Sequence, residues 1–258
     1  NLKSIVPTIY LRNIVFLKSS KEDLDMLADN VNFLINKYHK EDFNEETINE
    51  FQMDCDWTPK TKENYFYFLK KLKTISGKQI SCTLRLYPYK YPDKMGVPPV
   101  EKVTLMCHNL LNPLENPSKN SILDLSELKN YLKGSRTYSK HLDIALPIYS
   151  WAQVYHNEHF SAVLYTDTKQ LKTILKQDKP LWYSVIKDTV INNTYLRIGD
   201  KIKYEEIDAE KIKSTIALLK QHIKFDKNTT VTLFHLDENQ LNNFTYENLS
   251  DFYTDFSK

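Results

Sequence analysis

Short runs of β-branched and aromatic residues alternate with longer amphipathic segments along the chain, and this alternation constrains the fold more than any other feature. The predicted strands are residues 4–11, 48–55, 79–86, 102–107, 142–147 and 229–235. The predicted helices are residues 21–38, a segment that starts at Thr58, and residues 124–133, 208–223 and 246–256. A repeated strand-then-helix order is typical of a parallel sheet with right-handed crossovers.

The number and length of these segments favour a barrel. A chain of 258 residues can bury one full core, and a single (β/α)8 barrel commonly uses about 250 residues. We therefore predict an α/β, TIM-like (β/α)8 barrel that forms one domain over residues 1–258. Six strands are clear and a run near Tyr195 could add a seventh, so an incomplete or irregular barrel is the alternative.

A second pattern interrupts the alternation after Trp151. Residues 153–155 and 160–165 alternate in hydrophobicity around a polar segment at residues 156–158. This pattern predicts a β-hairpin insertion near residues 152–165 that decorates the barrel. His156 and His159 would lie at the hairpin tip rather than on a helix, so their spacing does not indicate a zinc protease.

The charge balance and the absence of several motifs exclude some classes of function. With 35 basic and 33 acidic side chains the net charge is only +2, so we expect no nucleic-acid partner. The three cysteines have no C-x-x-C spacing and indicate neither a disulfide framework nor a zinc knuckle. The chain contains no Walker loop, G-x-G-x-x-G or G-x-S-x-G motif, and we predict no cofactor and no metal.

The sequence also bears on membrane association. No apolar stretch reaches the roughly 18 residues of a membrane-spanning helix, so we expect no transmembrane segment. Residue 1 is Asn, and a strand-like run begins by Ile5. From this we expect that a leader or another N-terminal segment has been removed or left out.

The strongest functional signal lies at the end of the second predicted strand. Gln52, Asp54 and Asp56 share one face of that strand, and Trp57 follows directly. Ligands of parallel α/β folds bind at the carboxyl ends of the strands. Asp54 and Asp56, about 6–7 Å apart along a strand, are the candidate catalytic pair, one as proton donor and one as base or stabiliser. The alternative is structural, with Asp54 bound to a neighbouring group and Asp56 starting the next helix.

Other strand ends supply the candidate substrate-binding residues. They join Gln52 and Trp57 and are Arg85, Tyr87, His108, Tyr149, Trp151 and His235. Arg85 would lie beside the aspartates if the two strands are neighbours, either tuning a carboxylate or binding a substrate oxygen. Tyr149 and Trp151 offer flat rings that stack on sugars. Each of these residues also has a structural alternative, since ion pairs, hydrogen-bonded histidines and core aromatic residues are common.

Several short motifs follow one another along the chain: QMDCDWT at 52–58, YF at 65–66, TLRL at 83–86, GVPPV at 96–100, DIALP at 143–147, LRIGD at 196–200 and FHLD at 234–237. Together and in this order, they resemble an uncharacterised bacterial family of glycoside-hydrolase-like (β/α) barrels that are often lipoproteins. Met53 stands in place of an expected isoleucine, which is a harmless change. Cys107 and His108 stand where a tyrosine is expected, which weakens the case for a general role of His108.

The resemblance implies a barrel fold, a carbohydrate-related role and a location in the bacterial cell envelope. Such a protein would be a periplasm-facing or surface outer-membrane lipoprotein, with a lipid anchor upstream of residue 1. Two functions follow. One is a glycosidase-like enzyme that acts on a glycan or another small polar ligand. The other is a catalytically silent barrel that binds glycan or serves as a subunit of an outer-membrane protein complex; Glu205 is the only weak candidate for a second carboxylate on another strand.

Overall fold

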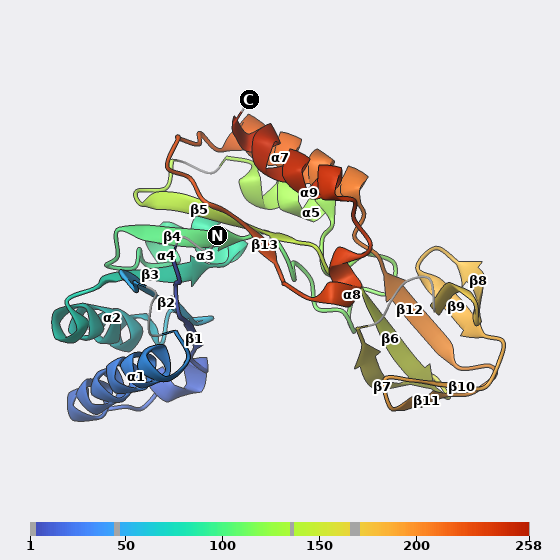
Figure 1. Cartoon of the computed structure of the whole chain (residues 1–258), viewed down its shortest axis with the longest axis horizontal. Coiled ribbons are helices and arrows are strands. Elements are labelled where there is room, and N and C mark those ends of the chain that lie inside the picture. The colour runs from blue at the N-terminus through green and yellow to red at the C-terminus, as the bar shows by residue number, and fades with distance from the viewer. Residues whose placement is uncertain (1–3, 44–46, 135–136, 166–170, 258) are drawn as a thin grey trace. The chain divides into compact units, whose positions relative to one another are not determined.

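The central element of the computed structural model, which describes residues 4–43, 47–134, 137–165 and 171–257, is a six-stranded sheet (Figure 1). Its strands are β1 (Thr8–Tyr10), β2 (Glu50–Asp54), β3 (Gln79–Leu84), β4 (Lys102–Met106), β5 (His141–Pro147) and β13 (Val231–Phe234). Their order in the sheet is β1-β2-β3-β4-β5-β13. These are the six strands that the sequence predicted.

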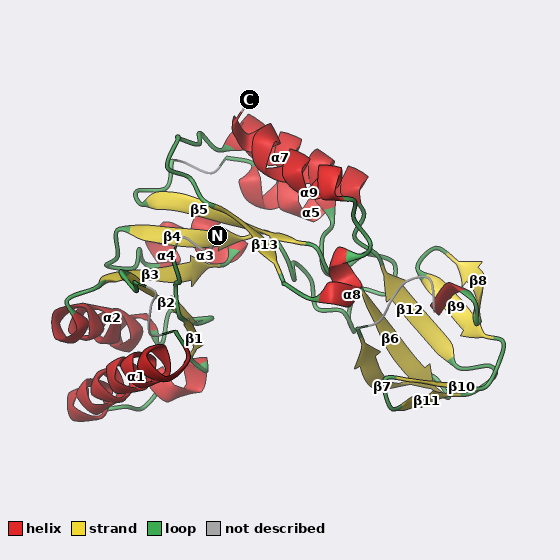
Figure 2. Cartoon of the chain, in the orientation of Figure 1, coloured by secondary structure: helices red, strands yellow, loops and turns green. Residues whose placement is uncertain are grey.

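The pairing of these strands identifies the fold class. β1, β2, β3 and β4 pair in parallel, with Thr8 opposite Gln52 and Gln52 opposite Ser81. Helices connect consecutive strands, as Figure 2 shows for the red and yellow elements. The prediction of a TIM-like (β/α) barrel in its irregular, incomplete form is confirmed, because the sheet has six strands rather than eight.

The chain divides into two compact units, and the division falls within β5. Unit 1 comprises Asn1–Met106 and Gly134–Ile144, and unit 2 comprises Cys107–Lys133 and Ala145–Lys258. That the whole chain acts as one domain stays a prediction.

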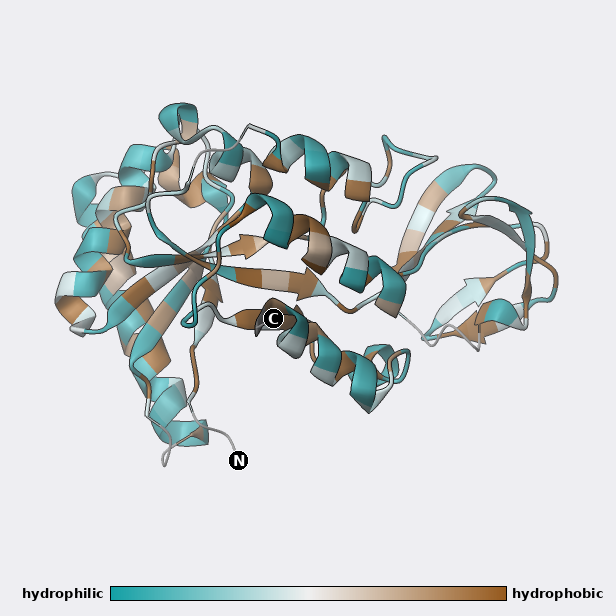
Figure 3. Cartoon of the chain, turned by 90° about the horizontal axis from the view of Figure 1, so that it is seen from above, coloured by the Kyte–Doolittle hydropathy of each residue, from teal (hydrophilic) through white to brown (hydrophobic). Residues whose placement is uncertain are grey.

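Two long helices cover one face of the sheet in unit 1. α1 (Lys21–Asp42) begins with a capping box between Ser20 and Asp23, and its buried residues recur at helical spacing. α2 (Lys62–Ser76) buries Tyr65, Phe68 and Leu72. Unit 1 also contains η1 (Asn13–Phe16), α3 (Leu86–Lys90) and α4 (Pro92–Met95). Figure 3 shows hydrophobic and hydrophilic residues on different faces of the helices.

The predicted start of α2 at Thr58 is wrong by three residues. Thr61 is the cap residue, and residues 58–61 form a turn in front of the helix. The Thr58 backbone N–H donates to Thr61 Oγ1 at 2.9 Å, and Thr61 Oγ1 donates to Asn13 Oδ1. These bonds engage the Thr58 backbone N–H and the Thr61 hydroxyl in the turn instead of in a helix that starts earlier.

In the part of unit 2 that the structure describes, four helices have both ends defined. They are α5 (Leu125–Leu132), α7 (Ala209–His222), α8 (Glu238–Leu241) and α9 (Tyr246–Ser257). Aspartates cap the first three, since the side chains of Asp124, Asp208 and Asp237 accept backbone N–H bonds in the first turn.

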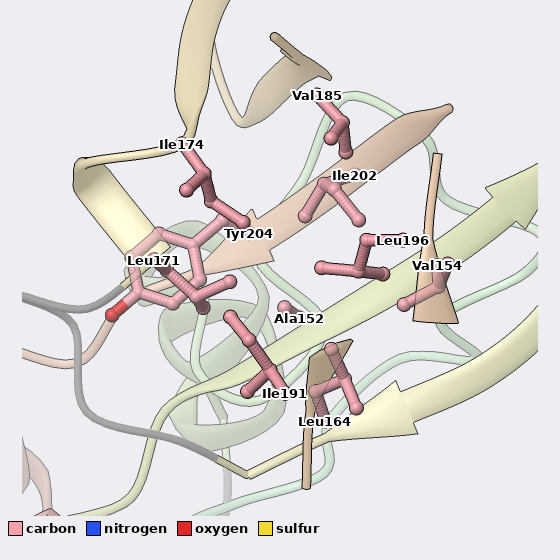
Figure 4. Close-up of a cluster of buried hydrophobic side chains, with 10 residues drawn as sticks. All are labelled: Ala152, Val154, Leu164, Leu171, Ile174, Val185, Ile191, Leu196, Ile202 and Tyr204. Carbon is pink, nitrogen blue, oxygen red and sulfur yellow. The ribbon is translucent and has the colours of Figure 1, made fainter. Parts of the chain in front are cut away.

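The predicted hairpin insertion is present and belongs to a larger structure. β6 (Trp151–His156) and β7 (His159–Leu164) form the hairpin. With β8 (Leu175–Lys179), β9 (Trp182–Val185) and β12 (Lys201–Glu205) they form a five-stranded sheet of order β7-β6-β12-β9-β8. β10 (Thr189–Ile191) and β11 (Thr194–Leu196) pair separately, so the run near Tyr195 does not join the barrel sheet. Figure 4 shows the buried side chains of this insertion, among them Val154, Ile202 and Tyr204.

We expect Gly96→Ala to destabilise the protein more than Gly77→Ala. Both glycines have positive φ, which alone makes Ala unfavourable by about 1–2 kcal/mol. A Cβ at Gly96 would also lie 2.8 Å from the Phe66 ring, whereas a Cβ at Gly77 meets nothing within 4 Å. The measurement is the free energy of unfolding in urea, and an equal loss in the two variants would contradict the steric argument.

Candidate functional site

Polar side chains line one face of the sheet in unit 1. On β2, Glu50, Gln52 and Asp54 alternate with the buried Phe51 and Met53. The Gln52 side chain reaches the neighbouring β1 and, across β3, also β4: it accepts from Thr8 Oγ1 at 3.4 Å and donates to Thr104 Oγ1 at 2.9 Å. The amide is therefore held in one orientation across β1, β2 and β4.

Asp54 and Asp56 have different environments at the carboxyl end of this face. Asp54 accepts the hydroxyl hydrogen of Thr83, with Oγ1 and Oδ1 2.7 Å apart. Asp56 lies just beyond β2 and pairs with Arg85 through two bonds, from Nε to Oδ1 at 2.6 Å and from a terminal nitrogen to Oδ2 at 3.1 Å. The parallel pairing of β2 with β3 thus brings Arg85 beside the aspartates, in the bidentate geometry that a guanidinium favours. We name Gln52, Asp54, Asp56 and Arg85 the strand-end cluster.

The exposure of the Arg85–Asp56 pair limits its contribution to stability. The Asp56 side chain is 50% exposed and that of Arg85 is 32% exposed. Ion pairs as exposed as this contribute only about 0–1 kcal/mol. The pair is thus better suited to presenting polar groups to a ligand than to stabilising the fold.

Trp57 and Tyr87, two residues of unit 1 that were predicted to bind substrate, do not belong to the strand-end cluster. Trp57 is buried, stacks on Tyr65 with ring centroids 5.6 Å apart and donates to the Met95 carbonyl at 3.0 Å. These contacts make it a core residue. Tyr87 does not continue the alternating face of β3, because that strand ends at Leu84 and Tyr87 lies in α3. It is partly exposed, contacts Tyr91 and accepts a bond from Lys94.

A partly buried ionic network at the starts of the strands was not predicted. Lys102 lies 2.9 Å from Glu50 and 3.0 Å from Asp143, and His141 lies 3.2 Å from Asp143. Burial lowers the pKa of Lys102, but hydrogen bonds to Glu50 and Asp143 outweigh it and raise that pKa overall. The signal was available, since Glu50 and Lys102 each begin a strand on the face that carries Gln52 and Thr104. The network lies at the strand starts, away from the strand ends where ligands bind.

The predicted site residues of unit 2 belong to one aromatic cluster. The rings of His108 and Phe234 stack with centroids 4.9 Å apart, and Tyr149 lies 5.5 Å from His235. Tyr149 Oη donates to Asn109 Oδ1 at 2.7 Å, which fixes that ring beside the residue that follows His108. His108 and Tyr149 are buried.

Trp151 and Tyr165 extend this cluster toward solvent. The Trp151 ring lies 5.8 Å from Tyr149 and 6.0 Å from Tyr165. Tyr165 and Phe234 are 44% and 42% exposed, although both are large aromatic residues. We name His108, Tyr149, Trp151, Tyr165, Phe234 and His235 the aromatic cluster. Sequence reasoning missed Tyr165 and Phe234; the position of Phe234 at the carboxyl end of β13 was the available signal.

The structure also bears on the second carboxylate, on metal binding and on membrane spans. Glu205, the candidate for a second carboxylate on another strand, is completely buried. Within the described ranges, no group of three or more His, Cys, Asp or Glu side chains could hold a metal ion. In the same part of the chain, no helix is long and apolar enough to cross a membrane.

Comparison with known proteins shows that this fold is similar to the barrels of solved chitinase structures. No protein-family model matches the chain, and no curated protein matches its sequence. Among solved structures, it is similar to the immunomodulatory active chitinase TsES1 from Trichuris suis, with 13% identity, coverage of 95% of this chain and 76% of that chain, and a TM-score of 0.51. It is also similar to a GH18 chitinase from Cycas revoluta in complex with (GlcNAc)3, with 10% identity, coverage of 98% and 81%, and a TM-score of 0.53. The same values apply to that chitinase in complex with allosamidin. At these identities the likeness shows the fold.

We predict that none of the three cysteines reacts with a thiol reagent in the native protein at pH 8. Burial, with smaller effects from Asp56 and Asp54, raises the pKa of Cys55 to about 12, and burial raises the pKa of Cys107 to about 12 and also that of Cys82. The reactive thiolate is therefore scarce at pH 8. Because unfolded thiols titrate near pH 9, stability should fall as the pH rises above 9.

The measurement is reagent uptake with and without denaturant, where we expect no fast-reacting thiol in the native protein and three after unfolding. Rapid native labelling of Cys55 would show that the core behind the strand-end cluster opens readily.

Proposed function

We propose that this chain is a carbohydrate-binding protein of the bacterial cell envelope with a glycosidase-like barrel, and that it recognises oligosaccharides of N-acetylglucosamine. The observation that carries this proposal is the strand-end cluster. Its amide, carboxylates and guanidinium lie at the carboxyl ends of β2 and β3 and are partly exposed. Such groups bind sugar hydroxyls. Within unit 2, flat rings such as Trp151 and Tyr165 form a separate surface that suits the apolar faces of sugars.

The choice of ligand rests on the fold. One similar structure is a chitinase in complex with (GlcNAc)3. Ligands of barrels with this topology bind at the carboxyl ends of the strands, where the strand-end cluster lies. An N-acetylated sugar also carries an amide that can exchange hydrogen bonds with Gln52 or Arg85.

Binding fits the geometry better than hydrolysis does. A glycosidase needs a carboxylic acid that gives a proton to the leaving oxygen. Both carboxylate oxygens of Asp56 accept bonds from Arg85, an arrangement that a protonated carboxyl would disrupt. Glu205 is buried. The two residues that follow Asp56 and Trp57 are Thr58 and Pro59, and neither has an acidic group that could donate this proton.

Hydrolysis is the second candidate because the two aspartates differ in their partners. Asp54 accepts from a neutral hydroxyl, whereas Asp56 is held by a cation. Carboxylates in such different environments divide the roles of acid and stabiliser in known enzymes. In this mechanism Asp54 is the proton donor and Asp56, oriented by Arg85, stabilises the developing positive charge of the sugar.

We predict that Arg85→Met and Asp56→Asn each weaken the binding of N-acetylglucosamine oligomers about 10-fold or more, because each removes a charged group that would hydrogen-bond the sugar. The measurement is titration calorimetry with trimer to hexamer. Lys71→Met is the matched control, since Lys71 and Asp25 form another partly exposed ion pair in unit 1. Absence of binding by the unaltered protein to these oligomers would overturn the choice of ligand.

We predict that the unaltered protein binds these oligomers without releasing reducing ends. Product analysis after long incubation measures this. Turnover that disappears in Asp54→Asn while binding persists would establish the hydrolytic mechanism instead.

The envelope location rests on the resemblance of the sequence to lipoprotein barrels. With a lipid anchor upstream of residue 1, the natural protein would fractionate with membranes and incorporate a labelled fatty acid. It would then serve either alone or as a subunit of an outer-membrane complex. Recovery of the natural protein entirely in the cytosolic fraction would contradict the envelope location.

A further inference from the structure

A completely buried ion pair on β12 has no part in the strand-end cluster. The side chains of Lys203 and Glu205 are both 0% exposed, and Lys203 Nζ lies 2.7 Å from Glu205 Oε1. Removing two charges from water is unfavourable, so a buried pair persists only with good geometry and further hydrogen bonds. The surroundings of Glu205 and Lys203 supply those bonds.

Donors saturate both oxygens of Glu205. Oε1 accepts from Lys203 and from the Ser121 backbone N–H at 2.9 Å. Oε2 accepts from Ser121 Oγ at 2.5 Å and from Trp151 Nε1. Lys203 also donates to the Asn116 carbonyl at 2.7 Å. A carboxylate with this many donors has no capacity left for a substrate, so its role must be exerted through its partners.

The Trp151 ring, which is partly buried, is the end of this network nearest to solvent. Trp151 lies directly opposite Glu205 in the antiparallel pairing of β6 with β12, and its indole N–H points to the carboxylate. Turning the ring over would remove one of the two donors to Oε2 and take the indole N–H away from its acceptor, which is unfavourable in a buried network. Glu205 therefore selects one orientation of the ring that contacts Tyr149 and Tyr165.

The same carboxylate also fastens the loop that follows β4. Ser121 binds Glu205 through both its backbone and its side chain, and the neighbouring Asn120 donates to the Glu206 carbonyl at 3.0 Å. One buried group thus connects β12, this loop and Trp151, all within unit 2.

We propose that Glu205, held by Lys203 and Ser121, is a positioning residue that fixes the indole of Trp151 as a sugar-stacking wall of the aromatic cluster. The inference rests on the proposed function for its ligand but not for its geometry. A ring that is already fixed loses no rotational freedom when a sugar stacks on it, so binding is tighter than to a mobile ring.

The test follows the exchange of the three indole N–H protons with solvent by NMR. Lys203→Met with Glu205→Gln removes the charges but keeps an acceptor for Trp151. Lys203→Met with Glu205→Leu removes both charge and acceptor while keeping apolar volume, a replacement that often preserves folding. Trp151→Phe assigns the signal, and Trp57, bound to the Met95 carbonyl in unit 1, is the internal reference.

We expect the Trp151 proton to be protected in the unaltered protein and in the Gln variant, and to exchange at least about 10-fold faster in the Leu variant, since its acceptor is lost. Binding of the N-acetylglucosamine hexamer should weaken about 5- to 10-fold in the Leu variant and stay unchanged in the Gln variant. A separate single variant, Glu205→Asp, keeps the carboxylate beside Lys203 but shortens its reach to Trp151. We expect faster Trp151 exchange and weaker hexamer binding in this variant too. It decides the matter if the Leu variant does not fold.

Unchanged Trp151 exchange in the Leu and Asp variants would overturn the positioning role. Faster exchange with unchanged hexamer binding would overturn the role of Trp151 as a sugar wall. Absence of hexamer binding by the unaltered protein would instead remove the proposed function, while the exchange measurement would still report the positioning of the ring.

Discussion

The parallel register of β2 with β1 and β3 is the constraint on which the strand-end cluster depends. It places Thr8 opposite Gln52 and Gln52 opposite Ser81, so polar side chains of consecutive strands fall on the same face. A shift by one residue would turn Gln52 and Asp54 into the helix-covered core and expose Met53. Since Phe51 and Met53 are buried, the hydrophobic effect enforces this register, and the polar cluster is a consequence of it.

Two different physical means hold the two candidate ligand surfaces. In unit 1, partly exposed groups restrain one another through hydrogen bonds between Arg85 and Asp56 and between Thr83 and Asp54. In unit 2, a buried carboxylate restrains an aromatic ring from behind. Water competes with the first kind of restraint and not with the second. The strand-end cluster can therefore exchange its internal bonds for bonds to a ligand, whereas the ring keeps its orientation.

The sequence was sufficient for the six strands and most helices because the hydrophobic period of each is local. It was insufficient for the extent of the insertion, since β8 has four exposed residues and no apolar alternation. It also could not reveal the burial of Lys203 and Glu205. The segment KIKYE alternates like a half-exposed strand, and only packing of the loop with Asn116 and Ser121 against it removes the charged side from water. The prediction that Tyr87 shares a strand face with Arg85 was wrong for a related reason. It extended the alternation of β3 beyond the point where the backbone turns into α3.

A buried pair such as Lys203–Glu205 is weak evidence for stability, because apolar side chains of similar volume commonly serve the fold as well. Its retention needs a reason that an apolar pair could not supply. Leucine at position 205 could fill the space behind Trp151 but could not accept its N–H, and the ring would then be free to turn over. The carboxylate gives direction rather than volume, and Lys203 pairs with it at 2.7 Å where water has no access. The network is accordingly understood as part of the aromatic cluster that it orients, even though neither charged group reaches its surface.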